Sequence, residues 1–191
     1  MGLTPRSAMN STNLYGREIR FYAELAGKVS ITTPQVYYSA SDEDSGDHVL
    51  IMEDMSYAQN GDDLLGRSRE DALFCVRQLA RLHADWWDDT RISEFPGQHQ
   101  ISDQHQPRFQ RSWRLCMEKV GADLSPSFIT ICDLLTNRIG EISSALTSRP
   151  QTLIHGDFRY DNIFFSQNDG AVQLTLIDWQ LVERACAAYD V

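Results

Sequence analysis

The chain has 191 residues, enough for one ordinary domain or for one domain and part of another. Hydrophobic residues make up 42% and charged residues 23% of the chain, which is typical of a globular protein and excludes wholesale disorder. The net charge is −10 and no basic stripe is present, so nucleic-acid binding is not expected, because an acidic surface repels phosphate backbones.

No membrane or export segment is predicted. No apolar run reaches the roughly 18 residues that a transmembrane helix needs. The first residues, MGLTPRSAMNSTN, are polar and lack the apolar core of a secretion signal. The four cysteines form no CxxC pair, which favours free thiols in a reducing compartment. We therefore expect no membrane partner and a cytoplasmic location.

The first part of the chain is predicted to contain one helix and a pair of strands. Apolar residues at helical spacing predict a helix over residues 13–26, which Ser, Thr or Asn residues at 11–13 could cap. Pro34 then introduces an extended segment over residues 35–40, and a second apolar run covers residues 48–52. The acidic turn between the two runs favours an antiparallel pair.

The middle of the chain is predicted to be helical. Apolar residues recur at intervals of three and four over residues 68–88, and a similar pattern covers residues 109–120. A third, long helix is predicted over residues 126–148. Pro150 ends it, because proline disfavours helical geometry in the residue before it.

Short strands return in the last forty residues, at residues 152–154, 163–165 and 172–177. The turn sequence at residues 167–170 joins the last two runs as a hairpin. The order of elements is helix, strand pair, helical block and hairpin, which is neither an alternating βαβ pattern nor an all-helical one. The sequence therefore predicts an α+β fold.

The stretch HGDFRYDN carries the strongest chemical signal. It places Asp157 five residues before Asn162, and Asp178 ends the next apolar run, in LIDWQ. This is the layout of a kinase catalytic loop followed by a metal-binding aspartate. Phosphoryl transfer needs a carboxylate that orients the acceptor hydroxyl, and Asp157 fits this role. It also needs oxygen ligands for Mg²⁺, and Asn162 and Asp178 fit that one. Gly156 permits the tight loop that exposes the aspartate.

Each of these residues also has a simpler interpretation when taken alone. We assign His155 a structural role, since an isolated histidine is more often structural than catalytic. Asp178 alone could be a turn residue, and Asn162 alone an ordinary turn cap. The acidic residues within 85–89 are compatible with a cationic acceptor, but a solvated helix end explains them more simply.

These motifs resemble the aminoglycoside phosphotransferase and choline kinase superfamily, and are most similar to its ecdysteroid-kinase-like (CHK kinase-like) branch. The similarity covers most of the chain, in YGREIRFYAEL, HVLIMEDM, LARLHADWW, HGDFRYDNIFF, LIDWQ and AAYDV. The resemblance implies a protein kinase-like fold. Residues 1–52 would be the remnant of its N-lobe, and residues 53–191 a partial C-lobe with the catalytic loop.

The resemblance also implies a role for each matching residue. Asp157 would be the catalytic aspartate, with Asn162 and Asp178 as metal ligands. Glu18 matches the glutamate that pairs with the ATP-phosphate lysine, and Asp190 resembles a structural aspartate below the catalytic loop. The hinge that meets adenine corresponds to four consecutive residues, Met52, Glu53, Asp54 and Met55. The implied cofactors are ATP and Mg²⁺, and the implied partner is a small molecule with a hydroxyl group.

Two parts of the family pattern are missing. The only lysines are Lys28 and Lys119, so none precedes Glu18, and too few residues precede the first helix for a glycine-rich strand-turn-strand. Arg6 is a poor substitute for that lysine, because its planar head is bulkier. The family also continues beyond Val191 into further helices. We therefore expect an internal fragment that lacks most of the N-lobe sheet and the C-terminal helices, with weak or no activity.

Three functions are compatible with these residues. The first is an ATP-dependent phosphotransferase acting on a hydroxyl group of a small molecule. The alternative, motivated by the missing lysine, is a non-catalytic kinase-like binding or scaffold module. A metal-dependent hydrolase using His155, Asp157 and Asp178 is disfavoured, because the motif lacks a second, spaced set of histidine ligands. The sequence predicts neither the acceptor nor the oligomeric state.

Overall fold

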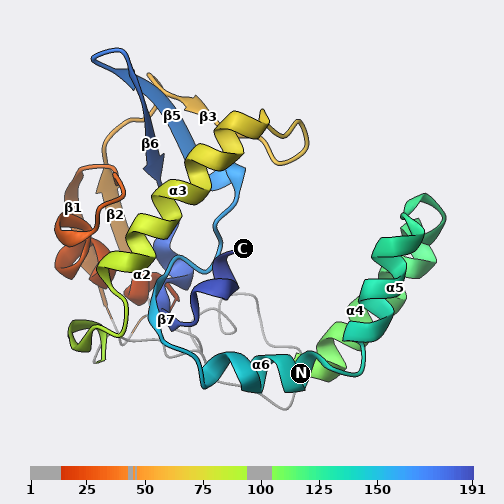
Figure 1. The fold of residues 1–191 in the computed structure, drawn as a ribbon. Helices are drawn as coiled ribbons and strands as arrows, with labels where there is room; N and C mark the ends of the chain where they lie inside the picture. Colours follow the sequence, from red (N-terminus) through yellow and green to blue (C-terminus); the bar gives the residue numbers. More distant parts are fainter. Residues whose placement is uncertain (1–13, 43–44, 46, 94–104) are drawn as a thin grey trace. The chain divides into compact units, whose positions relative to one another are not determined.

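The computed structural model describes residues 14–42, 45, 47–93 and 105–191, and these have the predicted mixture of helices and strands (Figure 1). The chain divides into two compact units, one formed by residues 1–98 with 151–191 and the other by residues 99–150. This division rests on contacts within each unit. The lobe boundary predicted between residues 52 and 53 stays a prediction.

The first unit begins with a helix and an antiparallel strand pair. Helix α2 spans Leu14–Glu24, and a 3-10 turn, Ala26–Lys28, follows it. The residues predicted to cap this helix lie outside the described residues. Strand β1 (Val36–Ser41) pairs antiparallel with β2 (His48–Met52), which confirms the predicted pair.

The hairpin predicted near the end of the chain is also confirmed. Strands β5 (Ile163–Asn168) and β6 (Ala171–Leu176) pair in register, and β3 (Gln59–Asn60) adds a third strand in the order β3-β5-β6. Asp169 and Gly170 form the turn with positive φ values of 49° and 80°. Two central residues with positive φ are characteristic of the type I′ turn, whose twist suits a hairpin.

Strand β4 leads into the HGDFRYDN stretch and is held by β7 and by helix α3. Strand β4 (Thr152–Ile154) pairs antiparallel with β7 (Glu183–Ala185), and all of β4 is buried. Helix α3 spans Arg69–Asp85 and begins where Ser68 caps it, because the Ser68 side chain accepts a hydrogen bond from the Asp71 amide. The Thr152 hydroxyl donates to the carbonyl of His83 at 2.7 Å and so ties β4 to α3.

The core of the first unit lies where α2 and α3 meet the strands (Figure 1). Its most deeply buried apolar side chains come from segments far apart in the sequence: Phe21, Leu79, Leu82, Trp86, Leu153, Ile163, Leu176, Trp179 and Val182. Burial of each such side chain contributes about 1.5–3 kcal/mol before entropy is counted. Trp179 directly follows Asp178, so this core reaches the candidate site.

The described residues of the second unit form three α-helices, and one sequence prediction is wrong here. The predicted long helix over residues 126–148 is two helices, α5 (Pro126–Leu135) and α6 (Ile139–Thr147). A continuous helix would pair the Gly140 amide with the Thr136 carbonyl. Instead Gln110 donates to the Thr136 carbonyl at 2.8 Å, and the Gly140 amide donates to Gln106 at 3.3 Å. Both glutamines lie on α4 (His105–Val120), so a tertiary contact breaks the helix.

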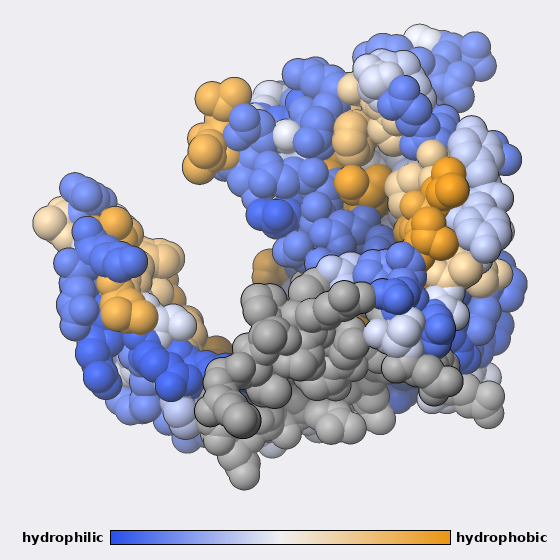
Figure 2. Space-filling model, turned by 180° about the vertical axis from the view of Figure 1, so that it is seen from behind, coloured by the Kyte–Doolittle hydropathy of each residue, from blue (hydrophilic) through white to orange (hydrophobic). Residues whose placement is uncertain are grey.

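The second unit buries few side chains. Within its described residues only Trp113, Cys132 and Ser143 are buried, and the Trp113 ring donates to Asp133 at 2.8 Å. Apolar side chains of these helices lie at the surface, orange at the left of Figure 2. Among the described helices, none combines the length and the apolar character that crossing a bilayer would require.

Gly61 should be essential for the packing of the segment after β3. Its amide donates to the Ile163 carbonyl at 2.8 Å, and an added Cβ would lie 2.1 Å from the carbonyl oxygen of Tyr160. We expect Gly61→Ala to lower the free energy of unfolding by about 1–3 kcal/mol, because the backbone must shift. Urea denaturation measures this change.

Gly27→Ala is the matched control. Its added Cβ meets no atom within 4 Å, so a change of less than about 0.5 kcal/mol is expected. Equal losses of stability in the two variants would contradict the packing argument.

Candidate functional site

The loop that follows β4 is bent by a glycine that no other residue could replace without strain. Gly156 has a φ of +83°, and an added Cβ would lie 2.5 Å from the Leu181 carbonyl oxygen. Glycine adopts this conformation without a steric penalty. The loop then passes through a 3-10 turn, Tyr160–Asn162, into β5. This bend presents Asp157, whose side chain is 33% exposed, as the prediction for Gly156 required.

Asp157 and Asn162 are joined by hydrogen bonds from one side-chain amide. Asn162 Nδ2 donates to the Asp157 carbonyl at 3.0 Å and to Asp157 Oδ2 at 3.1 Å. The amide nitrogen is thereby fixed toward Asp157, which leaves Asn162 Oδ1 as an oxygen available to another group. Asp157 Oδ2 also contacts Arg159 Nε at 3.3 Å. Within the described residues, Asp157 Oδ1 has no such partner.

His155 is fully buried and uses both ring nitrogens. Nε2 lies 2.9 Å from the Ile177 carbonyl, which can only accept, so Nε2 carries the proton. Nδ1 then accepts the Asp157 amide at 3.2 Å. Burial lowers the pKa of His155, against the opposing effect of nearby carboxylates such as Asp190. A neutral ring with both nitrogens occupied cannot ligate a metal, which removes the histidine that the hydrolase hypothesis needs.

Asp190 lies beneath the same loop and contacts its backbone at two consecutive residues. Asp190 Oδ1 accepts the Gly156 amide at 2.7 Å, and Oδ2 accepts the His155 amide at 3.0 Å. Asp190 Oδ2 also lies 2.8 Å from His83 Nε2, on α3. The buried carboxylate is therefore satisfied on both oxygens, as a charge in the interior must be.

Asp178 has a left-handed backbone conformation that its neighbour holds in place. Its φ and ψ are 65° and 59°, which costs a residue other than glycine roughly 1–2 kcal/mol. The Trp179 amide donates to Glu18 Oε1 at 3.1 Å. The Trp179 ring stacks on Phe21 with centroids 3.8 Å apart and meets the edge of His155 at 4.7 Å. The conformation of Asp178 is thus set by a buried side chain.

Glu18 lies in an acidic, partly buried environment on α2. Burial raises the pKa of Glu18, the charge of Asp178 raises it further, and the Trp179 amide opposes both effects. Tyr22 lies one helical turn further along, and its hydroxyl is buried without a hydrogen-bond partner. Burial, with Glu18 and Asp178, raises the pKa of Tyr22 far above its usual range, so its hydroxyl keeps its proton. Within the described chain, no cation pairs with Glu18.

The predicted hinge forms a separate turn after β2. The Glu53 amide donates to the Gln35 carbonyl at 2.8 Å, and Glu53 Oε2 accepts the Gln35 amide at 3.2 Å. Asp54 accepts hydrogen bonds from Ser56, which lower its pKa. Met52 ends β2, and Met55 is buried. No hydrogen bond or ion pair joins these four residues to the catalytic loop in the part of the chain that the structure describes.

The acidic residues at the end of α3 have structural partners. Asp88 Oδ1 accepts the Gln151 amide at 2.8 Å. Asp89 accepts the Arg91 amide at 2.7 Å, caps a 3-10 turn and forms an ion pair with Arg91. These contacts support the simpler interpretation of this cluster over binding of a cationic acceptor.

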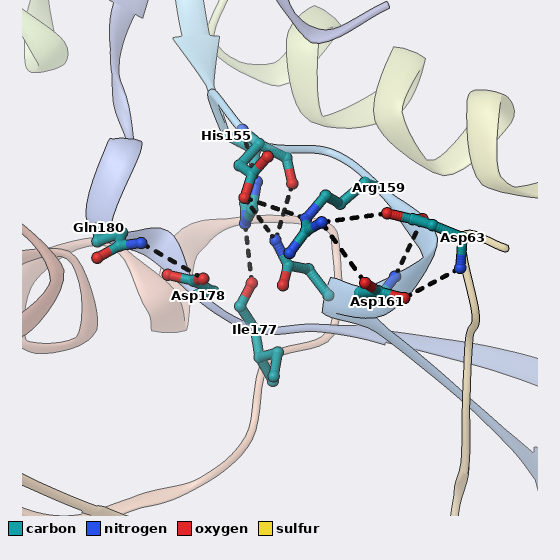
Figure 3. Close-up of polar contacts among 9 residues, drawn as sticks. Asp63, His155, Arg159, Asp161, Ile177, Asp178 and Gln180 are labelled. Atoms are coloured by element: carbon teal, nitrogen blue, oxygen red, sulfur yellow. Dashed lines mark hydrogen bonds and ion pairs between the residues drawn. The ribbon is translucent and has the colours of Figure 1, made fainter. Parts of the chain in front are cut away.

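Sequence reasoning did not single out a network of charges around Arg159 (Figure 3). Arg159 Nη1 lies 3.2 Å from Asp63 Oδ2 and 3.5 Å from Asp161 Oδ2, and Nε contacts Asp157. Asp63 is 96 residues from Arg159, so no local spacing reveals the pair. Arg159 itself could have been found, since it is a cation two residues after the candidate catalytic aspartate.

Loss of the Asp190 carboxylate should strongly destabilise the loop. Asp190→Ala leaves two buried amides and His83 without an acceptor, so we expect a loss of about 3–5 kcal/mol in the free energy of unfolding. Chemical denaturation tests this. Glu141→Ala, which removes an exposed ion pair with Arg138, is the control and should cost less than about 1 kcal/mol.

Burial of His155 predicts how stability changes with pH. The folded pKa lies below the ordinary value of 6.5, so below that pH the unfolded chain binds a proton that the folded chain rejects. The free energy of unfolding should therefore fall as the pH drops below about 6.5. We expect His155→Asn to flatten this dependence. The same dependence of the free energy of unfolding on pH in both proteins, measured by urea denaturation at several pH values, would contradict the assignment.

Comparisons with known proteins agree with this architecture. The model of the phosphotransferase enzyme family matches residues 4–191, whereas a search of curated proteins gave no match. A GDP complex of an aminoglycoside 2'-phosphotransferase-IIIa variant has a TM-score of 0.57 at 17% identity, covering 95% of this chain and 60% of the other.

Two further solved structures are similar. A GDP and kanamycin complex of APH(2")-IIia has a TM-score of 0.57 at 16% identity, covering 95% of this chain and 61% of that one. A microcompartment-associated aminopropanol kinase has a TM-score of 0.53 at 19% identity, with coverages of 98% and 57%.

The chain spans about 60% of the length of the first of these structures. At such identities the likeness shows the fold, which is the expected α+β, protein kinase-like one. Assignment to the ecdysteroid-kinase-like branch stays a prediction, as does the expectation of an internal fragment. Because the family model matches almost the whole chain, this protein belongs to the phosphotransferase enzyme family.

Proposed function

We propose that the protein transfers the γ-phosphoryl group of ATP to a hydroxyl group of a small molecule. The observation that carries this proposal is the coupling of Asp157 to Asn162 on one loop, with one carboxylate oxygen that accepts no hydrogen bond from the described residues. The bond from His155 to the Ile177 carbonyl ties this loop to the residue before Asp178. The shared fold and the family membership support the same reaction.

Asp157 is the base of the proposed reaction. Its Oδ2 already accepts a hydrogen bond from Asn162 and contacts Arg159, so Oδ1 is the oxygen that accepts the hydrogen bond of the acceptor hydroxyl. The acceptor oxygen attacks phosphorus and its proton passes to Asp157, while the bond from phosphorus to the ADP oxygen breaks. Asn162 orients the carboxylate through its amide.

Asn162 and Asp178 are the proposed Mg²⁺ ligands, and their donor atoms fit this ion. Asn162 Oδ1 takes no part in the bonds that fix Nδ2. Among the described residues, the Asp178 carboxylate accepts a hydrogen bond from Gln180 Nε2 alone, at 3.5 Å (Figure 3). Mg²⁺ binds few protein oxygens and keeps waters and phosphate oxygens as its other ligands. Among the described residues, no group of three or more His, Cys, Asp or Glu side chains is arranged to hold a metal ion by itself. When bound, Mg²⁺ neutralises phosphate charge.

The nucleotide contacts are assigned by position. The Met52–Met55 segment supplies backbone groups for adenine, and Glu18 acts from α2 beside Asp178. Two of the similar structures are GDP complexes, which supports a nucleotide as the phosphoryl donor.

The acceptor belongs to the class of small hydroxyl compounds. One similar structure contains kanamycin, and another is an aminopropanol kinase. The net charge of −10 favours such an acceptor over a nucleic acid.

A non-catalytic kinase-like binding or scaffold module is the second candidate, and it is favoured because no Lys or Arg side chain pairs with Glu18 among the described residues. The two functions predict different effects when the Asp157 carboxylate is removed. A phosphotransferase loses its activity with this carboxylate, whereas a binding module keeps its affinity for nucleotide.

Nucleotide binding should depend on Asp178. We expect Mg²⁺-ATP to raise the melting temperature of the chain and Asp178→Ala to abolish this shift, since a metal ligand is lost. Glu118→Ala, on the exposed face of α4, is the control and should respond like the original chain. Absence of a shift in the original chain, or an equal shift in Asp178→Ala, would refute the assignment.

Transfer should depend on Asp157. Asp157→Asn should keep the Mg²⁺-ATP shift but lower the rate of transfer to a hydroxyl acceptor by about 10²–10⁴-fold, because the base is removed. Measurement of ADP release over a panel of small alcohols and amino sugars tests this. An unchanged rate would favour the binding module.

A further inference from the structure

We propose that Arg159 is a further catalytic residue, which supplies the positive charge facing the phosphoryl group during transfer, and that Asp63 and Asp161 hold it for this task. The inference rests on the proposed function and adds a residue to it. Among the described residues, Arg159 is the one Lys or Arg side chain that forms an ion pair with Asp157, and none pairs with Asp178.

The guanidinium of Arg159 is held at two of its three nitrogens. Nε meets Asp157 Oδ2 at 3.3 Å, and Nη1 meets Asp63 Oδ2 at 3.2 Å and Asp161 Oδ2 at 3.5 Å. No hydrogen bond from Nη2 forms within the described residues. A guanidinium has five N–H donors in a rigid fork, so this arrangement leaves donors for a ligand.

Asp63 and Asp161 form a reciprocal lock behind the arginine. The Asp63 amide donates to Asp161 Oδ1 at 3.0 Å, and the Asp161 amide lies 3.4 Å from Asp63 Oδ1. Gly61 fastens the same two segments, because its amide donates to the Ile163 carbonyl. The lock joins the segment after β3 to the catalytic loop, as Figure 3 shows. Arg159 is therefore pre-positioned, which reduces the reorganisation needed when charge develops.

The arginine is also accessible where the reaction would occur. Its side chain is 49% exposed and that of its partner Asp157 is 33% exposed, so a ligand can contact both. Phosphate oxygens match the fork of a guanidinium, and bonds between the two ions are stronger than neutral ones. An arginine that only fastened the loop would not need to contact the catalytic carboxylate.

The proposed step conserves atoms and charge. The acceptor O–H proton moves to Asp157, the acceptor oxygen forms a bond to phosphorus, and the bond from phosphorus to the ADP oxygen breaks with its electron pair on ADP. Arg159 keeps its proton throughout. It binds the equatorial phosphoryl oxygens, whose charge is greatest while the group lies between donor and acceptor.

Aluminium fluoride, which mimics the transferring phosphoryl group, separates this role from a structural one. We would measure the affinity of the chain for Mg²⁺-ADP by calorimetry with and without aluminium fluoride. The original chain should bind ADP more tightly with aluminium fluoride. Arg159→Gln should reduce this gain by about 100-fold and leave binding of ADP alone unchanged, because the contact exists only with the transferred group.

Two further variants keep the test decisive. Arg159→Lys retains the positive charge but not the planar, forked guanidinium. This variant should keep part of the increase in ADP affinity that aluminium fluoride produces. Arg138→Gln removes an exposed guanidinium of the second unit that pairs with Glu141, and should keep all of it. Melting temperatures of all variants show whether each has folded.

The outcomes are distinct. A gain that is unchanged in Arg159→Gln overturns the role of Arg159 while the proposed function stands. Arg159→Gln could instead weaken ADP binding equally with and without aluminium fluoride and lower the melting temperature. That result would show that Arg159 is structural, and it would also overturn the proposed catalytic role. If the original chain does not bind Mg²⁺-ADP at all, the proposed function fails and this inference fails with it.

Discussion

The burial of Trp179 is the interaction on which the rest of the site depends. Its ring lies between Phe21 on α2 and His155 on the catalytic loop, and its amide is bonded to Glu18. Burying an aromatic ring of this size stabilises the fold by several times the roughly 1–2 kcal/mol that the left-handed conformation of Asp178 costs. Helix, loop and aspartate are therefore positioned together, and movement of any one of them requires Trp179 to leave the core.

The loop of residues 155–162, which carries the proposed catalytic aspartate, is held by one buried charged group and by one exposed network of charges. Asp190 is buried, and its two oxygens are satisfied by backbone amides and by His83, so solvent screens these bonds little. The Asp63–Arg159–Asp161 network is half exposed, so its contribution to stability is small and sensitive to salt. The buried contacts thus fix the backbone, while the exposed network can respond to a ligand.

Local spacing accounts for what the sequence predicts well. The motif predicts Asp157 and Asn162 on one loop, five residues apart, and strands β2 and β4 begin and end at the predicted residues. Tertiary contacts account for the failures. The helix predicted over residues 126–148 breaks because α4 takes its hydrogen bonds, β3 and β7 are too short to show alternation, and Asp63 reaches Arg159 across 96 residues.

Glu18 links α2 to the segment of Asp178 and also senses the charge of Asp178. Because Glu18 accepts the Trp179 amide, α2 stays attached to that segment. No Lys or Arg side chain pairs with Glu18 among the described residues, and the charge of Asp178 helps to raise the pKa of Glu18. Such negative charge favours a bound cation, since a divalent ion at Asp178 would remove the repulsion. An arginine, which cannot lose its charge, likewise suits a place beside the carboxylate of Asp157.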